Sequence, residues 1–485
     1  MHSLATLCLL LPSLPLVAAE TVLGAYVFHR HGDRTTKAYS PVSLTSLGAD
    51  QVFTSGSWYR DTYISANASS QINGIAADIP VLAQLSVTSS VDNVLQNSAQ
   101  VFLQGLYPPA GSAAAQTLAD GSTVQAPFNG YQYIPVNAVS TAASSKNSED
   151  NVWLQGGSGC ANAVTSSDNY FASAEYQSSL ETTKTFYQSL LPVYNATFPS
   201  DKANFKNAYA IYDFLHVSKI HNVSSTIPSA SLLTKETLHQ LQTRADQHEW
   251  GLAYNSSDEV RGIAGSLLAA QVVQALNATL AAPISKAAAQ RLTVQFGPYG
   301  TFMAFFGLTK ATAASSDFYG VVDYASSMVF ELVTNASLAT LKPADVSVRF
   351  RFANGTASKT NPPRAFALFG QAEITLPWAI FAREMGKFAI GDTASWCKAC
   401  GHSSACTEVS ATGNDSGATS SIAAGVSSAV SNAVAGVIGA LVTLVVILGL
   451  QGLFMAIVGL RVVKRSNNEP LAVKKSGESD DVSDT

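Results

Sequence analysis

The residues best suited to chemistry form one short run, Arg30-His31-Gly32-Asp33-Arg34. An imidazole stands here between two guanidinium groups, and a glycine lets the backbone approach a ligand closely. Two arginine forks can hold a phosphate bidentately, and their charge helps keep His31 neutral and nucleophilic. The run therefore favours an anion site in which Arg30 and Arg34 bind a phosphate beside His31. The alternative is a solvated basic loop without a ligand.

Two strand-like segments place this run at one edge of a predicted sheet. Residues 21–28 are β-rich and nearly all apolar, as in a strand buried on both faces, and the polar run follows at once. Ligands in open α/β sheets bind beyond the carboxyl ends of strands, so we expect the site there. Residues 292–296 begin a second such unit, with a turn at 297–300 and an apolar helix start at 301–308.

The middle of the chain predicts helices, and the later part predicts more strands. Residues 179–191 and 234–248 favour helices, which indicates a helical layer inserted between the two strand units. Strands are predicted at 328–333 and 346–352, the second with the alternation of a half-buried strand. Together these elements predict an α/β fold.

Apolar segments at both ends predict a secreted protein anchored in a membrane. Residues 4–17 are apolar and precede two alanines, which predicts a signal peptide over residues 1–19. Residues 433–460 are long and apolar enough for a tilted transmembrane helix, and basic residues follow: Arg461, Lys464 and Arg465. We expect a single-pass type I protein of the plasma membrane or another secretory-pathway membrane, with its main part extracellular or lumenal. A removed lipid-anchor signal is the alternative, but such a signal ends in its hydrophobic tail.

The segments around the predicted span have the composition of linkers. Residues 409–432 are rich in Ser, Ala, Gly and Thr and are predicted to form a flexible stalk. Residues 461–485 change from basic to acidic charge and are predicted to be a disordered cytoplasmic tail. Eight asparagines on the outer side stand in N-x-[ST] sequons and are expected to carry N-glycans: Asn67, Asn195, Asn222, Asn255, Asn277, Asn335, Asn354 and Asn414.

Four cysteines remain once the predicted signal peptide is removed: Cys160, Cys397, Cys400 and Cys406. An even number in an oxidising compartment predicts two disulfides. The alternative is a zinc site, because C-x-x-C followed by His402 and a further cysteine can hold tetrahedral zinc. Disulfides are the better interpretation, because oxidation competes for the thiolates.

Composition and charge exclude two classes of protein. Lys and Arg number 28 against 33 Asp and Glu, a net charge of −5, so no basic excess is present to neutralise a nucleic-acid backbone. Hydrophobic residues make up 47% of the chain, which excludes disorder throughout. We therefore expect a folded protein that does not bind nucleic acid.

The run RHGDRTT and the residues after it resemble the histidine acid phosphatases, branch 2 of the histidine phosphatase superfamily, which includes fungal phytases and acid phosphatases. The family signature near the mature amino terminus is RHGxRxP, and Thr36 stands here in place of the proline. The resemblance covers most of residues 21–408 and is weakest in the middle. Further similar positions are Leu44-Thr45, Gly48, Gln51, Gly56, Arg60, Tyr63, Asn97-Ser98-Ala99, Gly105-Leu106-Tyr107-Pro108, the segments MVFELV and VRFRFANG, Trp396-Cys397 and Cys400.

This resemblance implies a three-layer α/β core with a mainly parallel sheet, over residues 20–130 and 286–408, and a helical cap inserted at 131–285. It implies hydrolysis of phosphomonoesters, with His31 as the nucleophile that forms a phosphohistidine. Arg30 and Arg34 would bind the phosphoryl oxygens and stabilise the charge that develops on them. The ligand would be a phosphomonoester or another small anion, and neither a cofactor nor a metal is expected.

Two parts of the family pattern are missing. The family has a His-Asp pair after a late strand, where the His binds phosphate and the Asp protonates the leaving group, and the alignment places Pro298 and Tyr299 there. A third arginine normally precedes the "SA" segment, and Val87 or Thr88 stands nearest its place. Losing a general acid typically costs about 10²–10⁴ in rate. Three residues are candidate substitute donors: Asp33, Asp92 and Tyr299.

Two functional hypotheses follow. The first is a cell-surface phosphomonoesterase that works through His31 with reduced or altered proton donation, as the intact RHGDR run indicates. The second is a catalytically impaired pseudophosphatase, acting as a surface anion-binding or structural glycoprotein, as the missing pair and arginine indicate. A zinc-dependent hydrolase is a third, and it would need the cysteine and histidine cluster to hold metal.

Overall fold

The computed structural model describes residues 20–139, 159–283, 285–401 and 406. Four predicted segments lie outside these residues: the signal peptide, the stalk, the transmembrane helix and the cytoplasmic tail. The membrane topology therefore stays a prediction.

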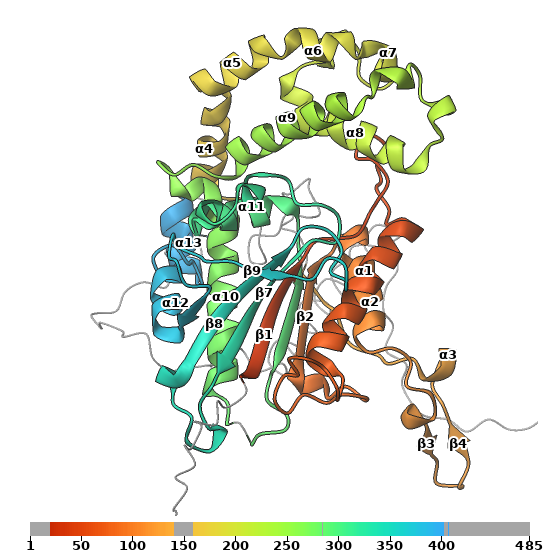
Figure 1. The fold of residues 1–485 in the computed structure, drawn as a ribbon, viewed down its shortest axis with the longest axis vertical. Helices are drawn as coiled ribbons and strands as arrows, with labels where there is room; N and C mark the ends of the chain where they lie inside the picture. The colour runs from red at the N-terminus through yellow and green to blue at the C-terminus, as the bar shows by residue number, and fades with distance from the viewer. Residues whose placement is uncertain (1–19, 140–158, 284, 402–405, 407–485) are drawn as a thin grey trace, which may run out of the picture. The chain divides into compact units, whose positions relative to one another are not determined.

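The centre of the fold is an eight-stranded sheet in the order β10-β8-β7-β1-β6-β2-β5, with β9 paired to β8 (Figure 1). Strands β1, β6, β2 and β5 are parallel neighbours, whereas β7 pairs antiparallel with β1, and β8, β9 and β10 extend that antiparallel half. The strands are β1 (Thr21–His29), β2 (Leu85–Ser90), β5 (Asn137–Val139), β6 (Leu292–Phe296), β7 (Ser327–Thr334), β8 (Val346–Ala353), β9 (Arg364–Ala365) and β10 (Thr375–Pro377).

The prediction of a mainly parallel sheet is wrong, because the sheet is mixed. Strands β7 and β8 are the reason. Residues 335–345 between them contain only two short 3₁₀ turns, and a connection without a crossover helix joins neighbouring strands antiparallel. The two strands pair in unbroken register from Ser327 opposite Ala353 to Thr334 opposite Val346.

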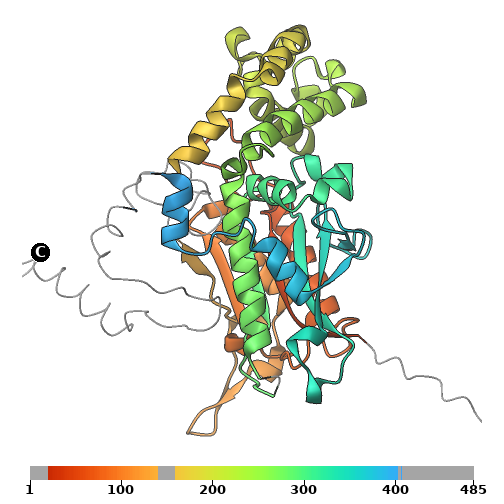
Figure 2. The same cartoon turned by 90° about the vertical axis from the view of Figure 1, so that its left-hand side faces the viewer.

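Helices cover both faces of the sheet, as Figures 1 and 2 show. Residues of β1 alternate between two buried clusters: Ala25 and Val27 pack on the α1 and α2 side, and Tyr26 and Phe28 on the α10 and α11 side. This double burial explains why β1 is almost wholly apolar. The covering helices are α1 (Ser46–Tyr59) and α2 (Asn93–Leu106) on one face and α10 (Ile263–Ala281), α11 (Tyr299–Leu308) and α12 (Trp378–Met385) on the other.

A separate helical layer with its own buried cluster follows in the middle of the chain. It contains α4 (Ala161–Phe171), α5 (Ala174–Thr182), α6 (Lys184–Ser189), α7 (Leu191–Tyr194), α8 (Ala208–His221) and α9 (Lys235–Ala253). We call these helices the cap. The predicted cap at 131–285 is broader, because β5 joins the sheet and α10 packs in the sheet's core.

Two helix predictions in the cap have different outcomes. The predicted helix at 234–248 is present as α9, and its N-cap Thr234 accepts a hydrogen bond from the backbone N–H of Thr237. The predicted helix at 179–191 is instead divided among α5, α6 and α7. Pro192 contributes to the division, because it lacks the N–H that would continue a helix from α6.

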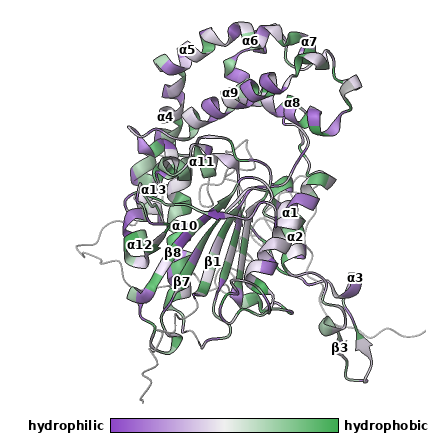
Figure 3. Ribbon diagram, in the orientation of Figure 1, coloured by the Kyte–Doolittle hydropathy of each residue, from purple (hydrophilic) through white to green (hydrophobic). Residues whose placement is uncertain are grey.

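Within the described part of the chain, one helical stretch, Glu259–Ala281, is long and apolar enough to cross a membrane. Most of it is α10. Leu268, Val272 and Leu276 of this helix belong to the buried cluster on the sheet, and Figure 3 shows the helix lying alongside the strands. The packing identifies α10 as a core helix.

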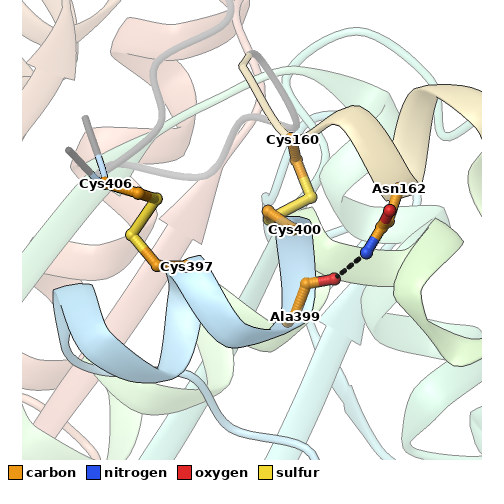
Figure 4. The surroundings of a disulfide bond; sticks show 6 residues. All are labelled: Cys160, Asn162, Cys397, Ala399, Cys400 and Cys406. Atoms are coloured by element: carbon orange, nitrogen blue, oxygen red, sulfur yellow. Dashed lines mark hydrogen bonds between the residues drawn. A yellow bond between two sulfur atoms is a disulfide. The ribbon is translucent and has the colours of Figure 1, made fainter. Parts of the chain in front are cut away.

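Two disulfides join the four cysteines, as predicted (Figure 4). Cys160, just before α4, bonds Cys400 at the end of α13 (Thr393–Cys400), and Cys397 bonds Cys406. The side-chain amide of Asn162 also donates to the carbonyl of Ala399 over 2.8 Å. The zinc alternative is wrong for this structure, because no thiolate of these four is left to bind metal.

Seven of the eight predicted glycosylation sites lie among the described residues. Asn255 is half-buried, and the other six are exposed: Asn67, Asn195, Asn222, Asn277, Asn335 and Asn354. The fold therefore leaves these six asparagines accessible to the glycosylation that the sequence predicts.

Candidate functional site

The polar run lies at the carboxyl end of β1, beside the carboxyl end of β6. His29 is opposite Phe296 in this parallel pair, and the N–H of Gly297 donates to the carbonyl of His29 over 3.0 Å. The chain after each strand therefore enters the same edge of the sheet. This arrangement brings residues 30–34 close to Tyr299, although more than 260 residues separate them in sequence.

His31 has the geometry of a nitrogen nucleophile. Its side chain is buried, with 1% exposed, and its Nδ1 lies 2.7 Å from the carbonyl oxygen of Gly32. A carbonyl only accepts, so Nδ1 carries the proton and Nε2 keeps its lone pair. Burial lowers the pKa of His31 well below its usual 6.5, and the charges of Arg30, Arg34 and Lys37 lower it further. Both effects favour the neutral form of the imidazole.

Two glycines allow the loop to press against the start of α1. A Cβ on Gly32 would lie 2.2 Å from the carbonyl oxygen of Gly48, and a Cβ on Gly48 would lie 2.0 Å from the carbonyl oxygen of Asp33. The N–H of Gly32 also donates to the hydroxyl of Ser98 in α2 over 3.2 Å. These contacts hold His31 in a fixed place relative to both helices.

Arg30 lies among aromatic rings and is 4% exposed. Its guanidinium carbon is 4.7 Å from the ring centre of Tyr324 and 5.3 Å from that of Tyr299. One terminal nitrogen donates to the carbonyl of Val322. Its Nε has no hydrogen-bond partner among the described residues, so this side chain keeps a donor that an anion could use.

Arg34 is fully buried and is paired with the cap. One terminal nitrogen donates to Oδ1 of Asp213 in α8 over 2.8 Å and to the hydroxyl of Tyr209 over 3.3 Å. The other carboxylate oxygen of Asp213 accepts from the hydroxyl of Thr36 over 2.9 Å and from the N–H of Lys37 over 2.8 Å. Asp213 therefore neutralises Arg34 and occupies one of its terminal nitrogens, whereas the Nε of Arg34 has no hydrogen-bond partner among the described residues.

Pro298 and Tyr299, which stand where the family has its His-Asp pair, make structural contacts. Pro298 is the N-cap of α11. The hydroxyl of Tyr299 donates over 2.6 Å to Oε2 of Glu249 in α9, and Oε1 of Glu249 lies 2.8 Å from Nδ1 of His248. The proton of Tyr299 is thus directed at a cap carboxylate, and its role as a donor to substrate stays a prediction.

The other predicted donors differ in their surroundings. Asp92 caps α2, where its Oδ1 accepts from the N–H groups of Val94 and Leu95 over 2.9 Å each, so its contacts are those of an N-cap. Asp33 is fully buried, and its Oδ2 lies 2.5 Å from the hydroxyl of Thr45 and 2.6 Å from Nε2 of His221.

The place of the third arginine holds no charge. Val87 is in the core, and Thr88 pairs with Asn137 in the sheet. A different cation is close by, because the ammonium of Lys37 lies 5.8 Å and 5.7 Å from the ring centres of Tyr209 and Tyr299. The sequence argument did not identify Lys37.

Helix α8 is the main contribution that the sequence argument missed. Residues at helical spacing on one face cover the polar run, with Asp213 on Arg34 and His221 on Asp33. Between α8 and Arg30 a cavity of about 20 Å³ remains, enough for a water molecule and too small for phosphate. Its lining includes Tyr209, Asp213, His216 and Tyr324. The cap is closed over the site.

Comparisons with solved structures show the same fold. The phytase from Citrobacter braakii matches with a TM-score of 0.52 at 11% identity, covering 76% of this chain and 98% of that one. The Hafnia alvei phytase in complex with tartrate matches with a TM-score of 0.50 at 12% identity, and the match covers 77% of this chain and 98% of that one. The Klebsiella sp. ASR1 phytase matches with a TM-score of 0.50 at 11% identity, and the match covers 78% of this chain and 99% of that one.

Sequence comparison identifies the family. No curated protein matches the sequence directly. The profile of the histidine phosphatase superfamily, branch 2, matches residues 35–352, which is about two-thirds of the chain and begins one residue after Arg34. The fold, the position of the polar run and this match agree, and the chain belongs to branch 2 of the histidine phosphatase superfamily.

Proposed function

We propose that the chain is a cell-surface phosphomonoesterase that works through a phosphohistidine on His31. One observation carries the proposal. His31 is held neutral, with Nδ1 bonded to the carbonyl of Gly32 and Nε2 left as the nucleophile between two arginines. Membership of the phosphatase family supports the same chemistry.

The reaction has two steps. In the first, Nε2 of His31 attacks phosphorus, a P–N bond forms, and the P–O bond to the leaving group breaks with its electron pair on oxygen. In the second, water attacks phosphorus and the P–N bond breaks. Arg30 and Arg34 stabilise the negative charge that gathers on the phosphoryl oxygens. Because the His-Asp pair is absent, we expect esters with stable leaving groups to react fastest.

Substrate entry requires the part of α8 around Asp213 to move off Arg30 and Arg34. The present cavity beside Arg30 cannot hold a phosphate, and Arg34 is already bonded to Asp213. Phosphate would therefore take the place of the Asp213 carboxylate on Arg34. This exchange of one anion for another costs less than exposing a bare buried guanidinium.

The second candidate function is that of a pseudophosphatase which binds an anion or acts structurally at the cell surface. The Arg34–Asp213 pair favours it, since a site whose arginine is neutralised by its own cap can persist without substrate. Pro298 and Tyr299 favour it too, because neither supplies the carboxylic acid of the family.

Hydrolysis of an activated aryl phosphate between pH 4 and 7 distinguishes the two functions. We expect the full-length protein in detergent to turn over this substrate, and His31→Ala to lose at least about 10³ of the rate, as removal of a nucleophile does. Alkaline quenching should trap phosphate on the wild-type protein alone. His239→Ala is the matched control, because His239 is exposed on α9. If correctly folded wild-type protein shows no turnover, the pseudophosphatase is the candidate function that remains.

We also propose that the protein is a type I membrane glycoprotein. The apolar segment at 433–460, the basic residues after it and the exposed sequons support this orientation. In sealed membranes, protease should remove only the tail from the cytoplasmic side, and N-glycosidase should lower the mass of the rest. Removal of the main part from the cytoplasmic side would show the opposite orientation.

A further inference from the structure

The cap places His221 against Asp33, the acidic residue two positions after His31. Nε2 of His221, the last residue of α8, lies 2.6 Å from Oδ2 of Asp33. Asp33 is fully buried, whereas 34% of the His221 side chain is exposed. A buried carboxylate thus holds a partly accessible imidazole, and such a pair can fix the orientation of a histidine.

Asp33 is itself held rigidly in the loop. Its N–H donates to the side-chain oxygen of Gln51 over 2.8 Å, and its Oδ2 accepts from the hydroxyl of Thr45. Its Oδ1 is buried and has no hydrogen-bond partner among the residues that the structure describes. This buried carboxylate therefore has spare acceptor capacity, and the imidazole of His221 lies within hydrogen-bonding distance of it.

His221 also lines a cavity of about 470 Å³ between the loop after Arg34 and the cap. Its lining is otherwise hydroxyl groups, rings, amides and apolar side chains, and it contains no Lys, Arg, Asp or Glu. Thr35, Thr36, Tyr39, Thr197 and Phe214 are among these residues. A cavity of this size and polarity suits an organic group without charge, because apart from His221, which the proposed reaction uses, its lining offers a second phosphate no charged side chain.

We propose that His221, oriented by Asp33, donates the proton to the leaving group, and that this cavity takes the uncharged alcohol part of the ester. The proposal rests on the proposed function. When the P–O bond breaks, its electron pair stays on the alcohol oxygen, and His221 supplies the proton that converts it to the alcohol. In the second step, water gives a proton back to His221 as its oxygen bonds to phosphorus. The cap would thus supply the general acid that position 299 lacks.

A pair of substrates tests this role, because a proton donor matters most for poor leaving groups. In His221→Gln we expect kcat/KM for an alkyl phosphate, glycerol 2-phosphate, to fall by about 10²–10⁴. For p-nitrophenyl phosphate we expect a loss of less than about tenfold, since its leaving group is stable as an anion. Asp33→Asn should show the same selectivity with a smaller loss. His239→Gln is the matched control.

The possible outcomes separate the two proposals. Equal losses on both substrates would show a structural role for His221, and an undiminished rate on glycerol 2-phosphate would show no role; either result overturns this inference while the proposed function stands. If His31→Ala leaves both rates unchanged, or wild type hydrolyses neither ester, the proposed function fails and this inference with it. Thermal unfolding of each variant shows that it is folded.

The charge of the substrate tests the cavity. We expect an added second phosphate on the alcohol part to lower kcat/KM by at least about tenfold, because apart from His221 the lining has no side chain of positive charge to pair with it. Glycerol 1-phosphate against glycerol 1,3-bisphosphate is the comparison. Faster hydrolysis of the bisphosphate would overturn the assignment of an uncharged alcohol to this cavity.

Discussion

Replacing Asp213 with asparagine is expected to lower the free energy of unfolding by about 3–5 kcal/mol. Arg34 and Asp213 are both buried, with 0% and 3% of their side chains exposed, and their atoms are 2.8 Å apart. Removal of one charge leaves the other buried without compensation. Asparagine keeps an oxygen for Thr36 and the N–H of Lys37, so the loss reports mainly the missing charge. Chemical denaturation measures it.

Inorganic phosphate should reverse part of this loss. If phosphate takes the place of the carboxylate on Arg34, it should raise the melting temperature of Asp213→Asn more than that of wild type. Asp201→Asn is the matched control, since 73% of the Asp201 side chain is exposed and its ion pair is on the surface. A variant as stable as wild type, with no added response to phosphate, would contradict the role given to this pair.

The loss of stability in Asp213→Asn relative to wild type should depend on pH. Burial alone would raise the pKa of Asp213, but the charge of Arg34 and the hydrogen bonds from Arg34, Lys37 and Thr36 hold that pKa below its usual 3.8. A carboxyl group with a lowered pKa stabilises the fold above its unfolded value and stops doing so as the pH falls through its folded value. The difference in unfolding free energy between wild type and variant should therefore be constant near neutrality and shrink below about pH 4.

The strands and the position of the polar run could be predicted from the sequence, because both depend on the local pattern of residues. The run at 292–296 is apolar and bounded by turn residues, and it forms β6 with the same bounds. Residues 30–34 follow β1 directly, so the end of one strand was enough to place them. The direction of the strands could not be predicted in this way. Whether β7 runs parallel or antiparallel to β1 depends on how the chain returns to β1.

The cap contacts could not be predicted because they join residues distant in sequence. Arg34 and Asp213 are 179 positions apart, and Asp33 and His221 are 188 apart. Helix α8 packs an apolar stripe of Ala208, Ile211 and Leu215 inside the cap, while Asp213 faces the polar run. The spacing of Asp213, His216 and Tyr209 was the available signal, and it becomes meaningful only when the partner surface is known.

The Cys160–Cys400 disulfide is expected to stabilise the protein more than Cys397–Cys406 does. The first bond joins residues 240 positions apart and the second joins residues 9 apart. Loop-closure entropy alone predicts about 5 kcal/mol for the first and about 3 kcal/mol for the second. The first also ties the segment before α4 to α13, and both its cysteines are fully buried beside Trp396.

Two double variants separate these contributions: Cys160→Ala with Cys400→Ala, and Cys397→Ala with Cys406→Ala. Alanine avoids placing a hydroxyl in the buried cluster around Trp396, and removal of both partners leaves no free thiol to exchange. We expect the first variant to lose more stability in chemical denaturation and to expose α4 to limited proteolysis. The second variant should keep α4 protected, because the Cys160–Cys400 bond still joins its start to α13. The reverse order would mean that packing around Trp396, rather than the long loop closed by the disulfide, holds the cap's first helix in place.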